Sequence, residues 1–249
     1  MISDLLFRKR LGVPYLSLIL ILSCLIVSIP TYFSPKLYFV FGGNSQPFYP
    51  WQNIISSQFE HGSFFVETKI QQGLPLLVHL LGNLLVIALF GCISERILGT
   101  KKFFILILVA ATMNIFVRFI IKSYGNGISG IAWSFAPVIL LTIIIFFINH
   151  AKKLLHDFML YISIFLFLMM WIIISVGSEW TTNLFHLIAT IVGVLFTFIW
   201  KDEIVDRIQK SIINYDAVPL IKIRFVIVSL SLPIFLFVVL LLSLTGLIA

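Results

Sequence analysis

The sequence predicts an all-α polytopic membrane protein with seven transmembrane helices and a cytoplasmic N-terminus. Its 249 residues are 60% hydrophobic and only 11% charged, whereas charged residues make up about a quarter of an ordinary soluble domain. The mean hydropathy of +1.12 agrees with a membrane protein. The apolar residues gather in runs of about twenty, the length that crosses a bilayer as a helix. The basic residues between these runs indicate the orientation.

The chain opens with a short basic head at residues 1–10, followed by an apolar run at residues 11–33. This run is too long for a signal-peptide core and lacks an Ala-x-Ala-like cleavage site, so we expect a retained first span. Residues 34–73 are the longest polar segment. Their aromatic residues suit the lipid headgroup level, and we expect an irregular or interfacial outer loop there.

The next three spans are separated by short polar stretches. The second, residues 74–93, ends before the polar sequence at residues 94–96, and the third covers residues 103–121. The fourth, residues 128–148, contains Pro137. Proline removes a helical hydrogen bond, so we expect a kink in this span.

The remaining chain carries three further spans. The fifth span is expected at residues 158–176 and the sixth at residues 183–200. Residues 201–224 are polar and mildly amphipathic, and we expect them to form a cytoplasmic linker. The linker leads to a seventh transmembrane helix within residues 225–249.

The distribution of basic residues supports this topology. With the N-terminus in the cytoplasm, 13 of the 17 Lys and Arg residues lie on the cytoplasmic side. The outer side then holds Lys36, Lys69, Arg118 and Lys122. This asymmetry follows the positive-inside rule and favours an odd number of spans. The formal charge of +7 could suggest a nucleic-acid partner. Its distribution instead follows membrane orientation, so we expect no nucleic-acid partner.

Polar residues of chemical interest gather near the outer ends of the second, fourth and sixth spans. They are His79 and Asn83, Ser129, and Asn183 and His186. At a rise of about 1.5 Å per residue, the two histidines and the serine lie within roughly 10 Å of their helix starts. Polar groups inside a bilayer are costly and commonly face the bundle interior, so this set predicts a functional site.

Each of these residues also has a purely structural interpretation. His79, Asn83 four residues later, and His186 can hydrogen-bond between helices and simply hold the bundle together. Ser129 can bond its own helix backbone. That interpretation does not explain why all of them lie at one depth beside residues 125–130, which hold three glycines in six positions. We therefore favour a functional site.

A serine and a histidine together suggest a nucleophile and a general base. No Asp or Glu lies at the same depth in these three spans, so a dyad is expected. His79, Asn83 and the Ser129 backbone N–H can donate to a developing oxyanion, an effect worth about 3–4 kcal/mol per donor. His79 and His186 are alternatively metal ligands. However, no HExxH sequence, carboxylate or thiolate completes a zinc site, so we expect no metal and no cofactor.

Small and aromatic residues surround this set. Gly127 and Gly130 flank the serine and let other backbone come close. Trp133 lies one turn after the serine, where its ring either stacks on the histidine or packs as an ordinary aromatic. Gly193 and Ala189 form a stripe of small residues on the histidine's face of the sixth span. Such a stripe lets another helix approach closely, and the fourth span is the natural partner.

Taken in order, these sequences resemble the motifs of the rhomboid intramembrane serine proteases. Residues 127–130 resemble the family's GxSG nucleophile motif, and residues 79–83 resemble its HxxxN motif on the second helix. Residues 91–99 resemble the Gly…Glu…Gly pattern that closes that helix. His186 with Gly193 resembles the histidine and close-packing glycine of the sixth helix. GxSG alone occurs in many unrelated hydrolases, but the ordered set is specific.

The resemblance implies a role for each of these residues. Ser129 is the implied nucleophile, and His186 is the implied base and later acid. His79, Asn83 and the Ser129 amide are the implied oxyanion hole. Trp133 falls where the family often has an aromatic residue that packs on the histidine.

The resemblance also implies an architecture and a substrate class. Residues 11–200 are expected to form a six-helix rhomboid-like core, and the seventh helix is an addition to it. The expected partners are the lipid bilayer and single-pass transmembrane proteins, which are cut near the outer side. We expect a multi-pass integral protein of a bacterial plasma (inner) membrane. The oligomeric state stays open. Leu74 stands where the family often has a further histidine, and His61 is a candidate for its replacement.

Two other functions compete with proteolysis. A catalytically inactive rhomboid-like protein binds membrane clients and hands them on, but such relatives usually lack the serine or the histidine. A small transporter needs polar groups that continue toward the cytoplasmic half. Below Asn83 and His186, the second and sixth spans offer only Thr190 and Thr197, so we favour the protease.

Overall fold

The fold is described by a computed structural model of the chain. The described residues are 13–33, 58–59, 61, 79–121, 127–154, 165 and 180–213. Within these ranges the regular structure is entirely helical, as the composition predicts. The expected head at residues 1–10, most of the loop at 34–73, nearly all of the fifth span and the seventh span lie outside them. The seven-span topology and its orientation therefore stay predictions.

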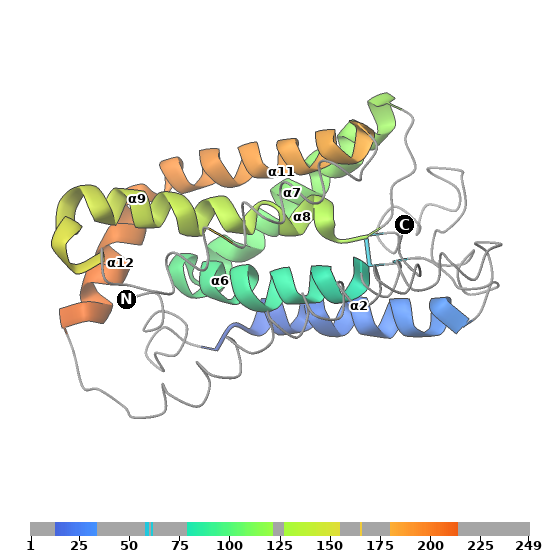
Figure 1. Cartoon of the computed structure of the whole chain (residues 1–249), viewed down its shortest axis with the longest axis horizontal. Helices are drawn as coiled ribbons and strands as arrows, with labels where there is room; N and C mark the ends of the chain where they lie inside the picture. The colour runs from blue at the N-terminus through green and yellow to red at the C-terminus, as the bar shows by residue number, and fades with distance from the viewer. Residues whose placement is uncertain are drawn as a thin grey trace.

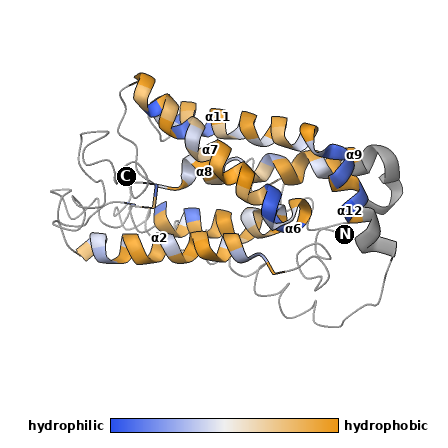
Figure 2. Cartoon of the chain, turned by 180° about the vertical axis from the view of Figure 1, so that it is seen from behind, coloured by the Kyte–Doolittle hydropathy of each residue, from blue (hydrophilic) through white to orange (hydrophobic). Residues whose placement is uncertain are grey.

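Four helices in the described residues are long and apolar enough to cross a membrane. They are α2 (Tyr15–Phe33), the helix His79–Leu98, α7 (Thr100–Ile121) and residues Thr182–Ile199 of α11 (Trp180–Ile199). They run along the long axis of the molecule (Figure 1). Most of their residues are hydrophobic (Figure 2). Many large apolar side chains on these helices are exposed. Apolar exposure on this scale fits helices that face lipid, and the protein is an integral membrane protein.

Three helices begin at positions that differ from the expected ones. α2 begins at Tyr15 instead of residue 11, directly after Pro14, whose missing N–H and fixed φ suit a helix start. α7 begins at Thr100, three residues before the expected start, and so includes Lys101 and Lys102. α11 begins at Trp180 instead of residue 183. Hydropathy marks only the apolar part of a helix, so helical turns made of polar residues are missed.

The second span continues beyond its expected end at residue 93. It includes a π-helical turn, η2 (Ile87–Gly91), and the short helix α6 (Cys92–Leu98). It ends at Gly99, whose φ of +80° favours glycine. The predicted end was wrong because Glu95 is a buried residue, only 2% exposed, and not part of a polar loop.

Glu95 is buried because it completes the N-terminus of α2. Its carboxylate accepts hydrogen bonds from the backbone N–H groups of Leu16 at 3.1 Å and Ser17 at 2.8 Å. The Ser17 hydroxyl at 2.9 Å and the Thr100 hydroxyl at 3.2 Å also donate to it. These backbone groups have no partner inside their own helix, so the carboxylate supplies one and joins three helices at one end of the bundle.

The fourth span is broken and not a single kinked helix. It consists of α8 (Ser129–Ala132) and α9 (Phe135–Leu154), joined by a turn at Trp133 and Ser134. The break follows from Pro137, whose ring clashes with the carbonyl four residues earlier. α9 then lies between α11 and the helix His79–Leu98 (Figure 1).

The polar stretch after α11 is helical in the described residues. α12 (Lys201–Ile213) packs against α6 and α9, and it buries Ile204 and Ile208. Lys102 of α7 forms an ion pair with Glu203 and lies over the Trp200 ring at 4.4 Å. The first half of the predicted linker is therefore an amphipathic helix that closes one end of the bundle.

Candidate active site

Ser129 lies at the start of α8, directly after a turn that requires glycine. Gly127 has a φ of +99°, a conformation that side chains other than glycine rarely adopt. The turn places the half-buried Ser129 at the first position of α8. The N–H groups of a first helical turn have no partner within their helix. The Ser129 N–H is one of these groups and has no partner within α8.

Gly130, which follows the serine, allows α7 to approach this turn. A Cβ atom here would overlap the side-chain amide of Asn114 on α7. Asn114 is 3% exposed and donates a hydrogen bond of 2.9 Å to the side-chain oxygen of Gln58. The segment that contains Gln58 is therefore held beside the serine turn by a buried polar contact.

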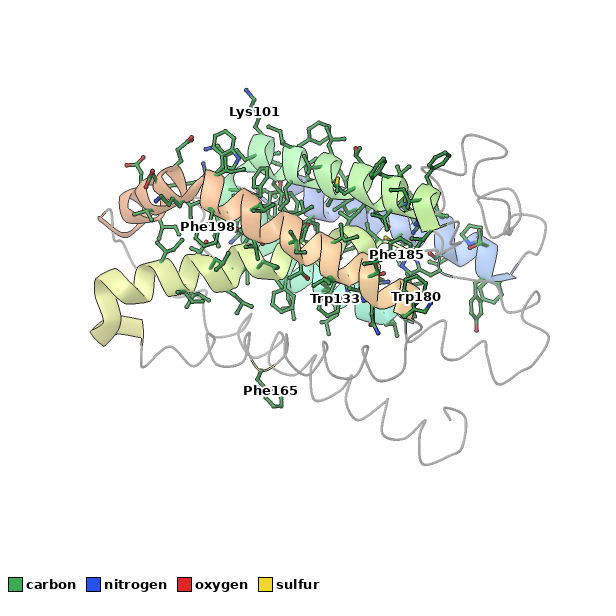
Figure 3. All side chains as sticks on the ribbon, turned by 90° about the horizontal axis from the view of Figure 1, so that it is seen from above. Lys101, Trp133, Phe165, Trp180, Phe185 and Phe198 are labelled. Carbon is green, nitrogen blue, oxygen red and sulfur yellow. The ribbon has the colours of Figure 1, made fainter. Side chains whose placement is uncertain are left out.

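His186 lies on α11 with its ring against Trp133. The two ring centroids are 4.9 Å apart and the ring planes are 30° from parallel, which is a stacked arrangement. His186 is 5% exposed, and its Nε2 has no hydrogen-bond partner among the described residues. Figure 3 shows Trp133 together with Trp180 and Phe185 of α11 in one half of the bundle. Since Trp133 follows the serine by one turn, the histidine lies beside the same short segment.

α11 comes close enough for this stack because Gly193 has no side chain. A Cβ atom at Gly193 would overlap the backbone carbonyl oxygen of Ser134. Ala189, one turn closer to His186, is 2% exposed. α11 accordingly contacts both α8 and α9. The stripe of small residues thus faces the fourth span in the structure.

Ser129 and His186 are not hydrogen-bonded to each other in this part of the chain. The structure brings together the elements that carry them, through the Trp133 stack and the α8–α11 contact. In a working dyad the base reaches the nucleophile within about 2.6–3.2 Å, although such contacts are often longer without substrate. The arrangement is compatible with a dyad that tightens when substrate binds.

His79 and Asn83 lie in the first two turns of the helix His79–Leu98. Asn83 is 6% exposed, and its Nδ2 has no partner among the described residues. His79 is exposed, and its Cε1 lies 3.5 Å from the position that a Cβ atom of Gly127 would take. His79 therefore lies beside the turn that precedes Ser129, and Asn83 follows it one helical turn later with an amide nitrogen that is unpaired in the described part of the chain.

His61 also reaches this site, which the sequence analysis left open. It is 4% exposed, and its ring meets the ring of His79 edge-on, with centroids 5.4 Å apart and planes at 71°. Burial first, and then the neighbouring His79, lower the pKa of His61 from its usual value to about 3, so its imidazole is neutral near pH 7. The sequence offers no periodicity around His61 that predicts this position.

No group of three or more His, Cys, Asp or Glu side chains is placed to hold a metal ion within the described ranges. The polar atoms near Ser129 are imidazole nitrogens and side-chain amides, together with backbone N–H groups. These groups can donate and accept protons and can bind an anion.

Comparison with known proteins gives one match. The family model described as the Rhomboid domain matches residues 76–202, just over half of the chain. The matched region contains His79, Ser129 and His186, and the elements that carry them. No curated protein and no solved structure matches the chain.

Proposed function

The chain belongs to the rhomboid family, and we propose that it is an intramembrane serine endopeptidase. The proposed substrates are single-pass transmembrane proteins, cut near the outer side of the bilayer. The bacterial plasma membrane is its proposed location.

The stack of Trp133 on His186 is the observation that carries the proposal. It fixes the plane of a buried imidazole whose Nε2 is free of other described partners. It does so one helical turn after Ser129. Buried polar atoms are rarely left unpaired. A histidine that served only to join helices would therefore be expected to form a hydrogen bond to a neighbouring helix through this nitrogen.

The proposed reaction begins when the Ser129 Oγ attacks the scissile carbonyl carbon and gives its proton to His186. The carbonyl oxygen becomes an oxyanion, which accepts hydrogen bonds from His79, Asn83 and the Ser129 N–H. His186 then donates the proton to the leaving amine, and the peptide bond breaks. A water molecule hydrolyses the acyl-enzyme, again with His186 as base, and restores the Ser129 hydroxyl.

Gly127, Gly130 and Gly193 have supporting roles in this proposal. Gly127 supplies the left-handed turn before the serine, and Gly130 admits Asn114 beneath it. Gly193 lets α11 reach the α8–α9 turn. Gly127 has a φ that other residues rarely adopt, and a side chain at Gly130 or Gly193 would overlap its neighbours. The relative positions of Ser129 and His186 therefore depend on glycine at all three positions.

The test is cleavage of a single-pass reporter in lipid vesicles, with the products identified by mass. Wild type is expected to cut the reporter near one end of its transmembrane segment. Ser129→Ala and His186→Ala are each expected to abolish cleavage while the bundle stays folded. Ser23→Ala is the matched control, because the Ser23 hydroxyl on α2 donates to the Ile19 carbonyl of its own helix.

The alternative is a catalytically inactive relative that binds membrane clients. It predicts that wild type binds the reporter without cutting it. It also predicts that Ser129→Ala binds the reporter with the same affinity as wild type. Full cleavage by a folded Ser129→Ala protein would refute the dyad.

A further inference from the structure

The ring of His61 is bonded to the first span through one nitrogen. Its Nδ1 lies 2.9 Å from the Ser28 hydroxyl on α2 and 3.0 Å from the Phe59 carbonyl oxygen. The Ser28 hydroxyl donates to the same carbonyl oxygen at 2.8 Å. A bare Nδ1 would face that oxygen lone pair to lone pair, so Nδ1 carries a proton and donates. One buried hydroxyl therefore holds both the backbone at Phe59 and the ring of His61.

The opposite edge of this ring borders the serine turn, residues 127–130. A Cβ atom on Gly127 would lie 3.4 Å from Cδ2 and from Nε2 of His61, and 3.5 Å from Cε1 of His79. These are van der Waals distances, and Nε2 of His61 is buried. The ring of His61 also meets the ring of His79 edge-on, with the centroids 5.4 Å apart. His61 thus borders the turn and His79 directly, and a displacement of its ring reaches both.

The segment that carries His61 is attached a second time, through Gln58. The side-chain oxygen of Gln58 accepts a hydrogen bond of 2.9 Å from Asn114 on α7. A Cβ atom on Gly130 would overlap the Asn114 amide, so this amide lies directly against the serine turn. Gln58 and His61 are 3% and 4% exposed. The segment is therefore held near both glycines of the turn, in buried surroundings whose close packing transmits small displacements.

We propose that Ser28 is a positioning residue for the serine turn, which acts through the ring of His61. The Ser28 hydroxyl fixes where this ring lies, and the ring limits the positions that Gly127 and His79 can take. The first span thereby contributes to the order of the site, although it carries none of the proposed catalytic groups. The expected effect on rate rests on the proposed function, whereas the action of Ser28 on the turn does not.

A purely structural role for Ser28 is the alternative. Its hydroxyl would then only join α2 to the backbone at Phe59, and its loss would lower stability without moving the serine turn. Thr31 provides the matched control, because it is also buried on α2. Its hydroxyl donates to the Val27 and Ser28 carbonyls of its own helix, at 2.9 and 3.1 Å. Ser28→Ala and Thr31→Val each remove one buried hydroxyl from the same helix, but only Ser28→Ala removes a partner of His61.

The position of the turn can be followed through a single amide signal. Gly127 is the only glycine of the chain that directly follows an asparagine. Cell-free synthesis with carbon-13 carbonyl asparagine and nitrogen-15 glycine therefore gives one correlation signal in NMR spectra, which belongs to Gly127. The measurement needs no substrate and does not depend on catalysis.

Wild type is expected to give one sharp Gly127 signal. Ser28→Ala should displace or broaden this signal, because the His61 ring beside Gly127 loses one of its two hydrogen-bond partners. Thr31→Val should leave the signal at its wild-type position, although thermal unfolding should show a similar loss of stability. An unchanged Gly127 signal in folded Ser28→Ala protein, or an equal displacement in Thr31→Val, overturns the proposal.

A double-mutant cycle shows whether Ser28 acts through His61. In the His61→Ala background the ring is absent. A further Ser28→Ala change should then alter neither the Gly127 signal nor the rate of labelling by a fluorophosphonate serine probe. Additive effects of the two substitutions would mean that Ser28 acts by another route, and they would overturn the proposal.

Rates measured on the active protein give the last readout. Ser28→Ala is expected to slow labelling by about threefold to tenfold, the factor that corresponds to one hydrogen bond. His61→Ala is expected to slow it by roughly tenfold to a hundredfold, as for a misplacement of about 1 Å. For reporter cleavage the loss should lie in kcat, with little change in KM. If folded wild type is not labelled, the proposed function fails, while the Gly127 signal still decides the role of Ser28.

Discussion

Gly193→Ala is the change whose consequence the structure defines most sharply. The added methyl would overlap the Ser134 carbonyl oxygen. It would also lie 3.0 Å from the carbonyl carbon and 3.2 Å from the Cα of Ser134. These are backbone atoms at the break between α8 and α9, so no side chain can move aside. The helices themselves must separate.

The size of the effect follows from ordinary contact distances. Carbon atoms in good contact are about 3.5–4.0 Å apart, and the Ser134 carbonyl oxygen would lie closer to the methyl than either carbon, so α11 must move by roughly 1 Å or more. Inserting a methyl group into a packed core costs about 1–3 kcal/mol of unfolding free energy. The same shift carries His186 away from Ser129, and a misplacement of about 1 Å can cost roughly a hundredfold in rate. We expect a larger loss in reactivity than in stability.

The assay compares Gly193→Ala with Gly82→Ala by thermal unfolding and by the rate of reaction with a fluorophosphonate serine probe. Gly82 is also a helical glycine, but nothing lies within 4 Å of the position of its Cβ. Alanine is the better helix former by up to about 1 kcal/mol, so Gly82→Ala should be neutral or stabilising. Equal probe rates for Gly193→Ala and wild type would refute the packing argument.

Two further predictions concern the stacked ring and the buried carboxylate. Trp133→Leu should slow probe labelling by about twofold to tenfold, because an aromatic stack is worth about 0.5–1.5 kcal/mol. Trp133→Phe should keep most of the labelling rate, because its ring can still stack on His186. Equal losses of rate in both variants would show that stacking is not the reason for the slower labelling. Glu95→Gln should lower the unfolding free energy by about 1–3 kcal/mol, since an amide cannot accept all four hydrogen bonds and leaves buried donors unpaired. The control, Glu203→Gln, changes a largely exposed ion pair and should alter the unfolding temperature little.

The membrane helices in the described residues were predicted because hydropathy alone determines where an apolar helix can lie. Their ends were less predictable. Glu95 looks like the start of a polar loop, and only the nearby N-terminus of α2 explains its burial. The break at Trp133 could be derived from Pro137, but the sequence analysis expected only a kink. Helix ends depend on partners that a local pattern does not contain.

The candidate site was predictable to different degrees. The spacing of Ala189 and Gly193 predicted the close packing of the sixth span against the fourth, and the structure has it. For Trp133 the sequence allowed either stacking on the histidine or ordinary aromatic packing. Only the structure shows that its ring stacks on His186. His61 could not be placed, because its segment meets the site through contacts with α2 and α7 that lie far away in the sequence.

The most direct test of the central claim is labelling of the purified, folded protein by a fluorophosphonate probe, with the modified residue identified by mass spectrometry. The account predicts a single adduct on Ser129, which is lost in Ser129→Ala and in His186→Ala and retained in Ser23→Ala. An adduct on another residue, undiminished labelling of His186→Ala, or no labelling of folded wild type would contradict a dyad of Ser129 and His186.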